Sequence, residues 1–213
     1  MVSIQAPRGF NDILPGEQHG WRDSYRWQRL EEVFREVAHL YGYQEIRPPV
    51  VEYVDLFIHG VGATTDIVTK EMFNITPRGD DPDSRRMAMR PEFTAGLVRA
   101  YLENGLYNSP QPTKIFAYGP AFRYENVQKG RFRGFHQLDV EVFGAQDPAV
   151  DAEVIKLGLD VVARLGLTGL VVSVNSIGCP NCRPRYREAL KEHFRPHLGE
   201  LCEDCNTRFE KNP

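Results

Sequence analysis

A run of polar side chains that could bind a charged ligand lies between Lys114 and Gly144. Two apolar-rich segments flank the polar pentapeptide 126–130, which predicts a β-hairpin with the pentapeptide as its loop. Because side chains alternate along a strand, one face of the second strand is expected to carry the functional groups and the other face to be mainly apolar. In order from the loop, this face holds Arg131, Arg133, Phe135, Gln137, Asp139 and Glu141.

These residue types suit a ligand that combines a nucleoside triphosphate with an amino acid. Arginine binds phosphate oxygens through its planar fork and stays charged at working pH, and Arg123 on the first strand adds to Arg131 and Arg133. Phe135 can stack on a purine. Gln137 and Glu141 are about 13 Å apart at strand rise, a gap that their side chains can narrow to one amino acid. An ordinary half-exposed hairpin is the commoner explanation of alternation alone; the ordered set with its loop favours a ligand site.

The elements around this hairpin indicate a mixed, mostly antiparallel α and β pattern. Three-four apolar spacing predicts a helix over 21–41, which ends at Gly42. Residues 43–57 are expected to form a strand interrupted by Pro48 and Pro49, and 72–75 and 87–90 to form paired strands around the loop 76–86. Asp147 and Pro148 are typical of an N-cap and first turn, so a helix is predicted to about Leu165. A short buried strand is predicted at 170–174.

The segment Arg90 to Thr94 is expected to begin another helix. Pro91 fits a first helical turn, and apolar residues follow it at helical spacing. Glu92 can be explained as a carboxylate that complements the helix dipole. The functional alternative is that Glu92 and Thr94, with Gln137, bind an ammonium group.

Several of these segments resemble one known family. FRYENVQKGRFRGFHQLDVEVFG resembles the second signature motif of class II aminoacyl-tRNA synthetases in the form carried by histidyl-tRNA synthetases. APRGFNDILPGE is similar to that family's opening, YGYQEIRPPVVEYVDLF to the first class II motif, and MRPEFTAGLVRAYL to the segment that holds the substrate's amino group. The resemblance covers essentially all 213 residues, and several segments in the right order are more specific than one short motif.

The resemblance implies a class II α+β fold and histidine-tRNA ligase activity, with ATP, Mg²⁺, histidine and tRNA(His) as substrates and partners and a homodimer as the assembly. Histidine binding is expected from Glu92, Phe93, Thr94, Arg123, Gln137 and Glu141. Arg123 is the expected catalytic residue, and ATP binding is expected from Arg123, Glu125, Arg131 and Phe135. Gln128 and Lys129 are expected to meet the tRNA, and Pro49 to lie at the dimer interface. The family more often has glycine where this chain has Phe93, which bears on how closely the backbone can approach a ligand.

Four cysteines form a C-x2-C-x19-C-x2-C array: Cys179, Cys182, Cys202 and Cys205. Spacing alone favours a structural zinc, and four reduced thiols in an intracellular protein are the alternative. The resemblance argues against zinc, so no metal site is predicted. His193 and His197, between the pairs, are expected on a helix that starts near Pro184.

Composition bounds the remaining possibilities. A chain of 213 residues with 41% hydrophobic residues can form one or two domains, and its net charge of −3 gives no global basic field for nucleic acid. We find no phosphate loop, dinucleotide fingerprint or nucleophile elbow. Neither a signal peptide nor a bilayer-spanning run is present, which predicts a cytoplasmic protein without membrane contact.

The predicted domains are a catalytic core over 1–169, which contains motifs 1 and 2, and a region over 170–213 with the end of a core strand and the start of a cysteine-bearing insertion. The chain is expected to stop before the third class II motif and the anticodon-binding domain, and therefore to be poorly active alone. Two alternatives stay open: a synthetase-like regulatory subunit of ATP phosphoribosyltransferase in histidine biosynthesis, and a zinc-stabilised interaction module without chemistry.

Overall fold

The computed structural model describes residues 4–62, 65–76 and 85–211 and divides into two compact units, Met1–Thr168 and Gly169–Pro213. The strands of the first unit are β1 (Gln44–Glu45), β2 (Val51–Tyr53), β3 (Asn74–Ile75), β4 (Met87–Met89), β5 (Thr113–Phe122) and β6 (Gly134–Phe143). Its α-helices are α1 (Ser24–Leu40), α2 (Val54–Phe57), α3 (Thr94–Glu103) and α4 (Pro148–Arg164), with shorter 3-10 or π turns at Glu17–Arg22, Ile58–Gly62, Ile67–Glu71 and Leu106–Asn108. The second unit holds α5 (Cys182–Phe194), a 3-10 turn at Arg195–Glu200 and α6 (Glu203–Lys211).

Two three-stranded sheets organise the first unit. One has the order β1-β5-β6, in which β1 is parallel to β5 and β5 is antiparallel to β6 over ten residue pairs from Thr113↔Phe143 to Phe122↔Gly134. The other has the order β2-β4-β3 and is antiparallel throughout. The pairing of β3 with β4 confirms the predicted pair of strands, whereas residues 77–84 of the loop predicted between them lie outside the described residues.

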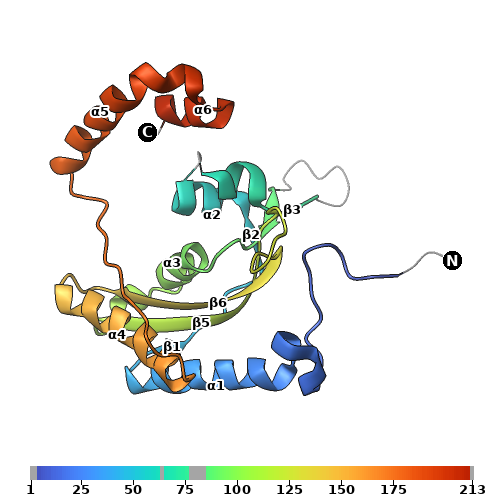
Figure 1. Ribbon diagram of the computed structural model, residues 1–213. Helices are drawn as coiled ribbons and strands as arrows, with labels where there is room; N and C mark the ends of the chain where they lie inside the picture. Colours follow the sequence, from blue (N-terminus) through green and yellow to red (C-terminus); the bar gives the residue numbers. More distant parts are fainter. Residues whose placement is uncertain (1–3, 63–64, 77–84, 212–213) are drawn as a thin grey trace. The chain divides into compact units, whose positions relative to one another are not determined.

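The sheet of β5 and β6 is covered on both faces (Figure 1). On one face Phe116 of β5 packs with residues of α1 and α4, such as Phe34 and Leu157, and this cluster is almost fully buried. On the other face Ile115 and Ala117 pack with Phe93 and Leu97 at the start of α3. Alternation along β5 therefore assigns its even residues to α1 and α4 and its odd residues to α3. A third cluster joins the second sheet to α2 and α3 through Phe57, Ala88 and Ala95.

The two long helices begin at capping residues. The Asp23 carboxylate accepts a hydrogen bond from the Tyr25 N–H at 3.2 Å, and the Asp147 carboxylate accepts one from the Ala149 N–H at 2.8 Å. Each cap satisfies an N–H group that has no partner within the helix. Helix α1 ends just before Gly42 and α4 at Arg164, so both predicted long helices are confirmed.

Two strand predictions are wrong. Residues 43–57 contain the short strands β1 and β2, but Val54–Phe57 is helical and turns Val54 and Phe57 into the core. Residues 170–174 form no strand and are exposed, with Val171 at 89% relative accessibility. An apolar run forms a buried strand only where a neighbouring strand completes its hydrogen bonds, and no described strand pairs with it.

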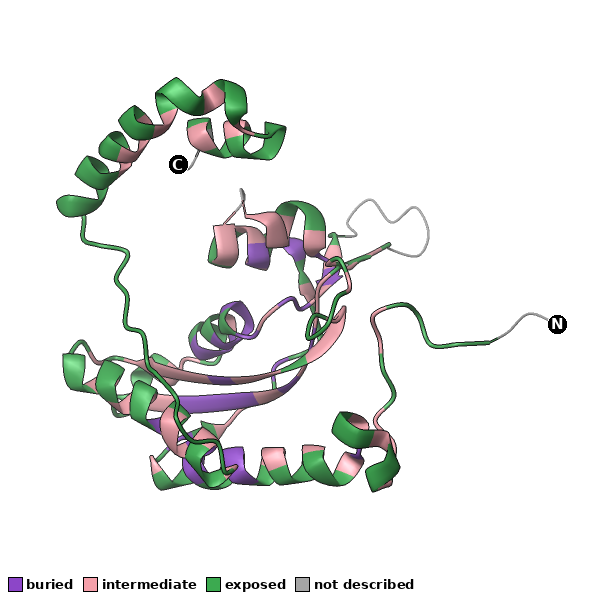
Figure 2. Ribbon diagram, in the orientation of Figure 1, coloured by how far each residue is buried: buried purple, intermediate pink, exposed green. Residues whose placement is uncertain are grey.

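The second unit differs from the first in burial. Its described residues are all exposed or intermediate, whereas the first unit has buried residues in α1, α3 and β5 (Figure 2). The helix predicted near Pro184 begins slightly earlier, at Cys182, and it contains His193, while His197 lies in the following 3-10 turn. In the described part of the chain no helix is long and apolar enough to cross a bilayer.

Candidate functional site

The antiparallel register gathers polar side chains of β6 on the face that α3 partly covers. Phe135, Gln137, Asp139 and Glu141 alternate along this face, and each is paired on β5 with one of Ala121, Gly119, Ala117 and Ile115. Three of these β5 residues are alanine or glycine, and above Gly119 the space is taken by Arg90 and Phe93. The strand therefore positions these four side chains as alternation predicted.

The loop end of the hairpin differs from the prediction. Strand β6 begins at Gly134, so Arg131 and Arg133 lie in an eleven-residue connection rather than on the regular strand. The N–H groups of Arg133 and Gly134 both donate to the Gly9 carbonyl, at 2.9 and 3.1 Å. A Cβ on Gly9 would lie 2.8 Å from Cγ of Arg133, so this close approach requires glycine. An N-terminal segment thus accepts both N–H groups, while the Arg133 carbonyl still accepts the Arg123 N–H across the hairpin at 2.9 Å.

A turn within the predicted pentapeptide closes the connection. Gln128 and Arg131 exchange backbone hydrogen bonds at 3.2 and 2.9 Å around Lys129 and Gly130. Gly130 has φ +78°, the left-handed conformation that glycine adopts without strain. Gln128 and Lys129 are exposed at this tip.

Cations and a carboxylate gather between this tip and the start of β6. Arg123 donates from Nε to the Pro91 carbonyl at 2.9 Å, and its guanidinium carbon lies 5.2 Å from the centroid of the Phe135 ring. Glu125 lies between two arginines, with a carboxylate oxygen 3.1 Å from Nη1 of Arg131 and another 3.9 Å from Nη1 of Arg123. The Arg131 side chain is 62% exposed and the Glu125 side chain 14% exposed, so Arg131 is the more accessible member of this group.

Glu71 is an acidic neighbour that sequence reasoning missed. Burial and then the charge of Glu125 raise the pKa of its carboxyl, while the charge of Arg123 lowers it. The Glu71 carbonyl also accepts the Tyr124 N–H at 2.6 Å. No motif in the sequence marks Glu71, because its contact with the hairpin depends on the path of a segment some fifty residues earlier in the chain.

Carboxylates gather at the other end of the face. Glu92 accepts a hydrogen bond from the Ala95 N–H at 3.0 Å, so it does serve the start of α3. Burial raises the pKa of Glu141 and the charge of Glu92 raises it further, while a hydrogen bond with Thr94 lowers it. Glu92, Thr94 and Glu141 are therefore close enough to interact, although about fifty residues separate the last from the other two.

Gln137 and the buried Asp139 form a polar pair between the two ends. Nε2 of Gln137 donates to Oδ2 of Asp139 at 2.9 Å. Oε1 of Gln137 is buried, and no hydrogen-bond partner for it exists among the described residues. Burial, followed by the charges of Glu141 and Glu92, raises the pKa of Asp139 to about 7. Alternation placed Asp139 on this face, but no role was predicted for it.

The side chain of Phe93 belongs to the core. It is 1% exposed and packs with Leu97 and Ala117. The buried Arg90 guanidinium lies 4.0 Å from the centroid of its ring and donates to the carbonyls of Pro48 and Pro120 at 2.9 and 2.8 Å. Only the Phe93 backbone is left to face a ligand, and Arg90, another residue that sequence reasoning missed, holds the loop before α3 against the sheet.

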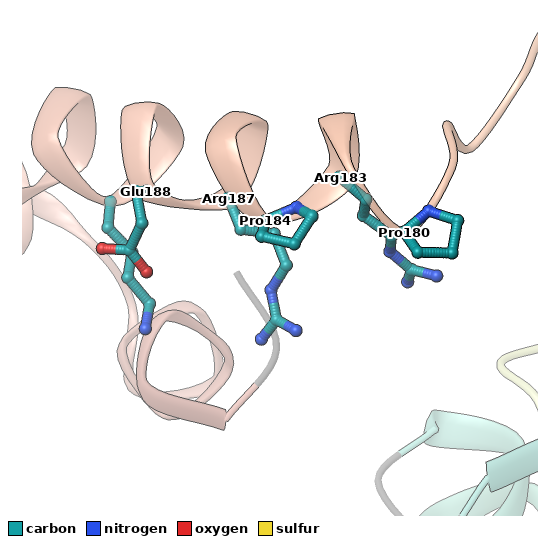
Figure 3. Close-up of a pocket in the computed structure, with 6 residues that line it drawn as sticks. Pro180, Arg183, Pro184, Arg187 and Glu188 are labelled. Carbon is teal, nitrogen blue, oxygen red and sulfur yellow. The ribbon is translucent and has the colours of Figure 1, made fainter.

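The cysteines form two separate pairs in the second unit. Sγ of Cys179 lies 3.4 Å from Sγ of Cys182, and all four thiols are free and exposed. Among the described residues, no three potential metal ligands of the His, Cys, Asp or Glu types come together. A shallow groove on this unit is lined by Pro180, Arg183, Pro184, Arg187, Glu188 and Lys191 (Figure 3). It contains none of the predicted site residues.

Comparison with known proteins identifies this arrangement. The model of the family described as histidyl-tRNA synthetase matches residues 9–180. A histidine--tRNA ligase of Symbiobacterium thermophilum is 94% identical over 212 residues, which is 100% of this chain and 49% of that protein. The crystal structure of apo S. aureus histidyl-tRNA synthetase matches with a TM-score of 0.72 and 37% identity, over 97% of this chain and 46% of that one.

A third match concerns the fold alone. A structure described as an ATP phosphoribosyltransferase regulatory subunit/histidyl-tRNA synthetase from Bacillus halodurans has a TM-score of 0.66 and 24% identity, over 94% of this chain and 52% of that one. A mostly antiparallel sheet flanked by helices, with the polar hairpin described above, is thus the fold of a class II aminoacyl-tRNA synthetase, which confirms the predicted α+β class. More narrowly, the chain belongs to the histidyl-tRNA synthetase family. It spans about half the length of the curated relatives it matches.

Proposed function

We propose that this chain supplies the ATP- and histidine-binding surface of a histidine--tRNA ligase. The observation that carries the proposal is the polar face of β6, where Gln137 presents a buried carbonyl oxygen without a partner among the described residues, on the same face as Glu141. Arginines Arg123 and Arg131 lie toward the loop end of the same hairpin. One surface therefore offers acceptors for a cationic amino acid and cations for a triphosphate.

In the proposed reaction the histidine carboxylate attacks the α-phosphorus of ATP, and the bond from that phosphorus to the bridging oxygen breaks to release pyrophosphate. A ribose hydroxyl at the 3′ end of tRNA(His) then attacks the carbonyl carbon of the adenylate, the bond from that carbon to the phosphate oxygen breaks, and AMP leaves. ATP enters as its Mg²⁺ complex, and the ion is part of the substrate. Positioning and charge stabilisation supply most of the rate, because no covalent protein intermediate is needed.

The histidine end uses acceptors. Glu92, Thr94 and Gln137 take the α-ammonium group, with the Phe93 backbone beside them, and Glu141 accepts a hydrogen bond from the imidazole. A cation near a helix N-terminus is disfavoured by the helix dipole, so the charge of Glu92 at the start of α3 reverses the local sign.

The ATP end uses cations and an aromatic ring. Arg123 contacts both the α-phosphate and the substrate carboxylate, and its bond to the Pro91 carbonyl holds it in place. Arg131, the more exposed arginine, can leave Glu125 and bind the outer phosphates. Glu125 and Phe135 then hold the adenine.

The position and exposure of surface residues support two partners, the tRNA and a second copy of the chain. Gln128 and Lys129, exposed at the hairpin tip, meet the acceptor end of the tRNA. Strand β2 lies at the edge of its sheet and exposes Tyr53 at 42%, and an uncovered edge of this kind is suited to pairing with a second copy. We therefore place a homodimer interface at Pro49 and the adjoining β2.

We propose that the chain has two domains and works in the cytoplasm. Residues 1–169 form the catalytic core, and residues 170–213 form the start of a cysteine-bearing insertion. The location is the cytoplasm, because that is where the proposed reaction supplies protein synthesis.

Histidine-dependent exchange of pyrophosphate into ATP tests the function. The assay is run on a polypeptide that carries residues 1–213 at the length of the curated relatives, with glycine in place of histidine as the control. Exchange only with histidine is the expected result. A synthetase-like regulatory subunit should show none, and the absence of exchange would favour that alternative, which the names of the curated relatives support less well.

A further inference from the structure

Asp139 occupies the centre of the polar face without a cationic partner in the described part of the chain. It is 9% exposed, lies between Gln137 and Glu141 along β6, and is paired across the sheet with the fully buried Ala117. Its carboxylate accepts a hydrogen bond from Nε2 of Gln137, at 2.9 Å. A buried carboxyl group in such a position needs a reason, because burial penalises its charged form.

The bond to Asp139 determines which end of the Gln137 amide faces the ligand. An amide has one donor end and one acceptor end. Because Asp139 takes the Nε2 donor, Oε1 points elsewhere, and Oε1 is buried without a partner among the described residues. A buried acceptor in this state is satisfied by a ligand that donates, and an ammonium group offers three donors.

We propose that Asp139 is a positioning residue that locks the Gln137 amide with its carbonyl oxygen toward the ligand, and so makes this site select an α-ammonium group. The inference rests on the proposed function and extends it to a residue that was given no role. Replacing Asp139 by a side chain that cannot accept a hydrogen bond would free the amide to rotate, and the site would lose its preference for a donor.

The charges around Asp139 support the same role. Glu141 on β6 and Glu92 before α3 both raise its pKa after burial has done so, and the hydrogen bond from Gln137 lowers it, with the result near 7. The Thr94 hydroxyl is engaged with Glu141. The cationic Arg90 approaches the sheet at Gly119, the partner of Gln137, where its Nη2 lies 3.0 Å from the position that a Cβ would take. An ammonium ligand would favour the ionised carboxyl, so binding should release a proton and tighten as the pH rises through about 7.

Two substitutions separate orientation from charge. Asp139→Asn keeps an acceptor for Gln137 and removes the charge, whereas Asp139→Leu removes both. Calorimetry on the 213-residue chain measures the affinities for L-histidine, Mg²⁺-ATP and imidazolepropionate. The last of these is histidine without its α-amino group. Asp151→Asn, an exposed change on α4, serves as the matched control.

At pH 8 we expect Asp139→Asn to lower the affinity for histidine about 10-fold, the equivalent of one pKa unit. Asp139→Leu should lower this affinity by roughly 100-fold, because the buried Nε2 donor of Gln137 then loses its acceptor. Affinity for Mg²⁺-ATP should change less than about 2-fold in both, and Asp139→Leu should reduce the preference for histidine over imidazolepropionate. The imidazole of free histidine titrates in the same pH range. The pH profile of histidine affinity for Asp139→Asn is therefore subtracted from the profile for the unsubstituted chain.

The outcomes of these measurements separate failure of the inference from failure of the proposed function. If Asp139→Leu keeps the preference for histidine over imidazolepropionate, the inference is overturned, and Asp139→Ala, which also lacks an acceptor, carries the same test if Asp139→Leu fails to fold. An Asp139→Asn variant that keeps the original pH profile of histidine binding overturns it as well. Equal losses for histidine and ATP would indicate general disruption and overturn it too. If the unsubstituted chain binds no histidine, the proposed function fails and the inference fails with it, whereas histidine binding that is indifferent to Asp139 removes the inference alone.

Discussion

Substituting Glu141 by glutamine removes a charge from the proposed histidine site while keeping the side-chain shape. The glutamine can still bond to Thr94 and can still accept a hydrogen bond, so the structural change is small. A hydrogen bond to a charged acceptor contributes about 1.5–3 kcal/mol and one to a neutral acceptor about 0.5–1.5 kcal/mol. The free energy of histidine binding should therefore become less favourable by roughly 1–2 kcal/mol, which raises the dissociation constant by roughly 5- to 30-fold.

The free energy of unfolding at pH 8 should rise or stay the same in Glu141→Gln. Burial raises the pKa of Glu141 in the folded chain. The hydrogen bond with Thr94 lowers this pKa, and the charge of Glu92 raises it, with a net rise. The folded state thus holds this proton more tightly than the unfolded state does. The stability that results is present below the unfolded-state pKa and is lost as the pH rises through the folded-state pKa. At pH 8 the native carboxylate is a cost to folding, and glutamine removes that cost.

The assay combines calorimetry with histidine and with Mg²⁺-ATP, and urea unfolding at pH 5 and pH 8. Glu36→Gln, which alters an exposed ion pair with Arg164, is the control for a lost charge. The expected result is weaker histidine binding, ATP binding within about 2-fold, and unfolding free energy at pH 8 equal to or above that of the unsubstituted chain. Equal losses for histidine and ATP, or a large loss of stability at pH 8, would refute the reasoning.

Three further predictions test other parts of the structure. Arg131→Ala should weaken Mg²⁺-ATP by about 10-fold in calorimetry and change the unfolding free energy by less than about 1 kcal/mol, because its ion pair with Glu125 is exposed on the arginine side; a change in stability without a change in ATP binding would contradict this. Asp23→Ala should lower the urea-unfolding free energy by about 1–2 kcal/mol through loss of the α1 cap, and an unchanged midpoint would show that the cap contributes nothing. Replacing Cys179 and Cys182 together by serine should leave zinc content, measured by plasma mass spectrometry, far below one per chain before and after, since no three ligands converge among the described residues; one zinc per chain that is lost on substitution would overturn that expectation.

Local patterns predicted the elements whose causes are local. Helix α1 follows from three-four apolar spacing and from Asp23, and α4 follows from Asp147 and Pro148, because capping and the helical period act within a few residues. Strand β6 presents Gln137 and Glu141 on one face for the same reason, since alternation needs no information from elsewhere in the chain.

Predictions failed where a distant segment supplies the partner. Arg133 left the predicted strand because the Gly9 carbonyl, more than a hundred residues earlier, accepts its N–H. Residues 170–174 have the composition of a buried strand, but burial requires a neighbour that the described sheets do not provide. Phe93 stands among predicted ligand contacts, yet its ring fills the core beneath Arg90.

The order of chemical groups along the hairpin, the long helices and the family were determined by the sequence itself, because residue identity, periodicity and capping are written into short stretches of chain. Only the tertiary structure decided that Glu92 and Thr94 meet Glu141, that Arg90 braces the loop before α3, and that Asp139 is buried with its carboxylate on Gln137. The contacts of Glu92, Thr94 and Arg90 join residues far apart in the chain, and the burial that raises the pKa values of Asp139 and Glu141 exists only once the sheet and α3 have packed together.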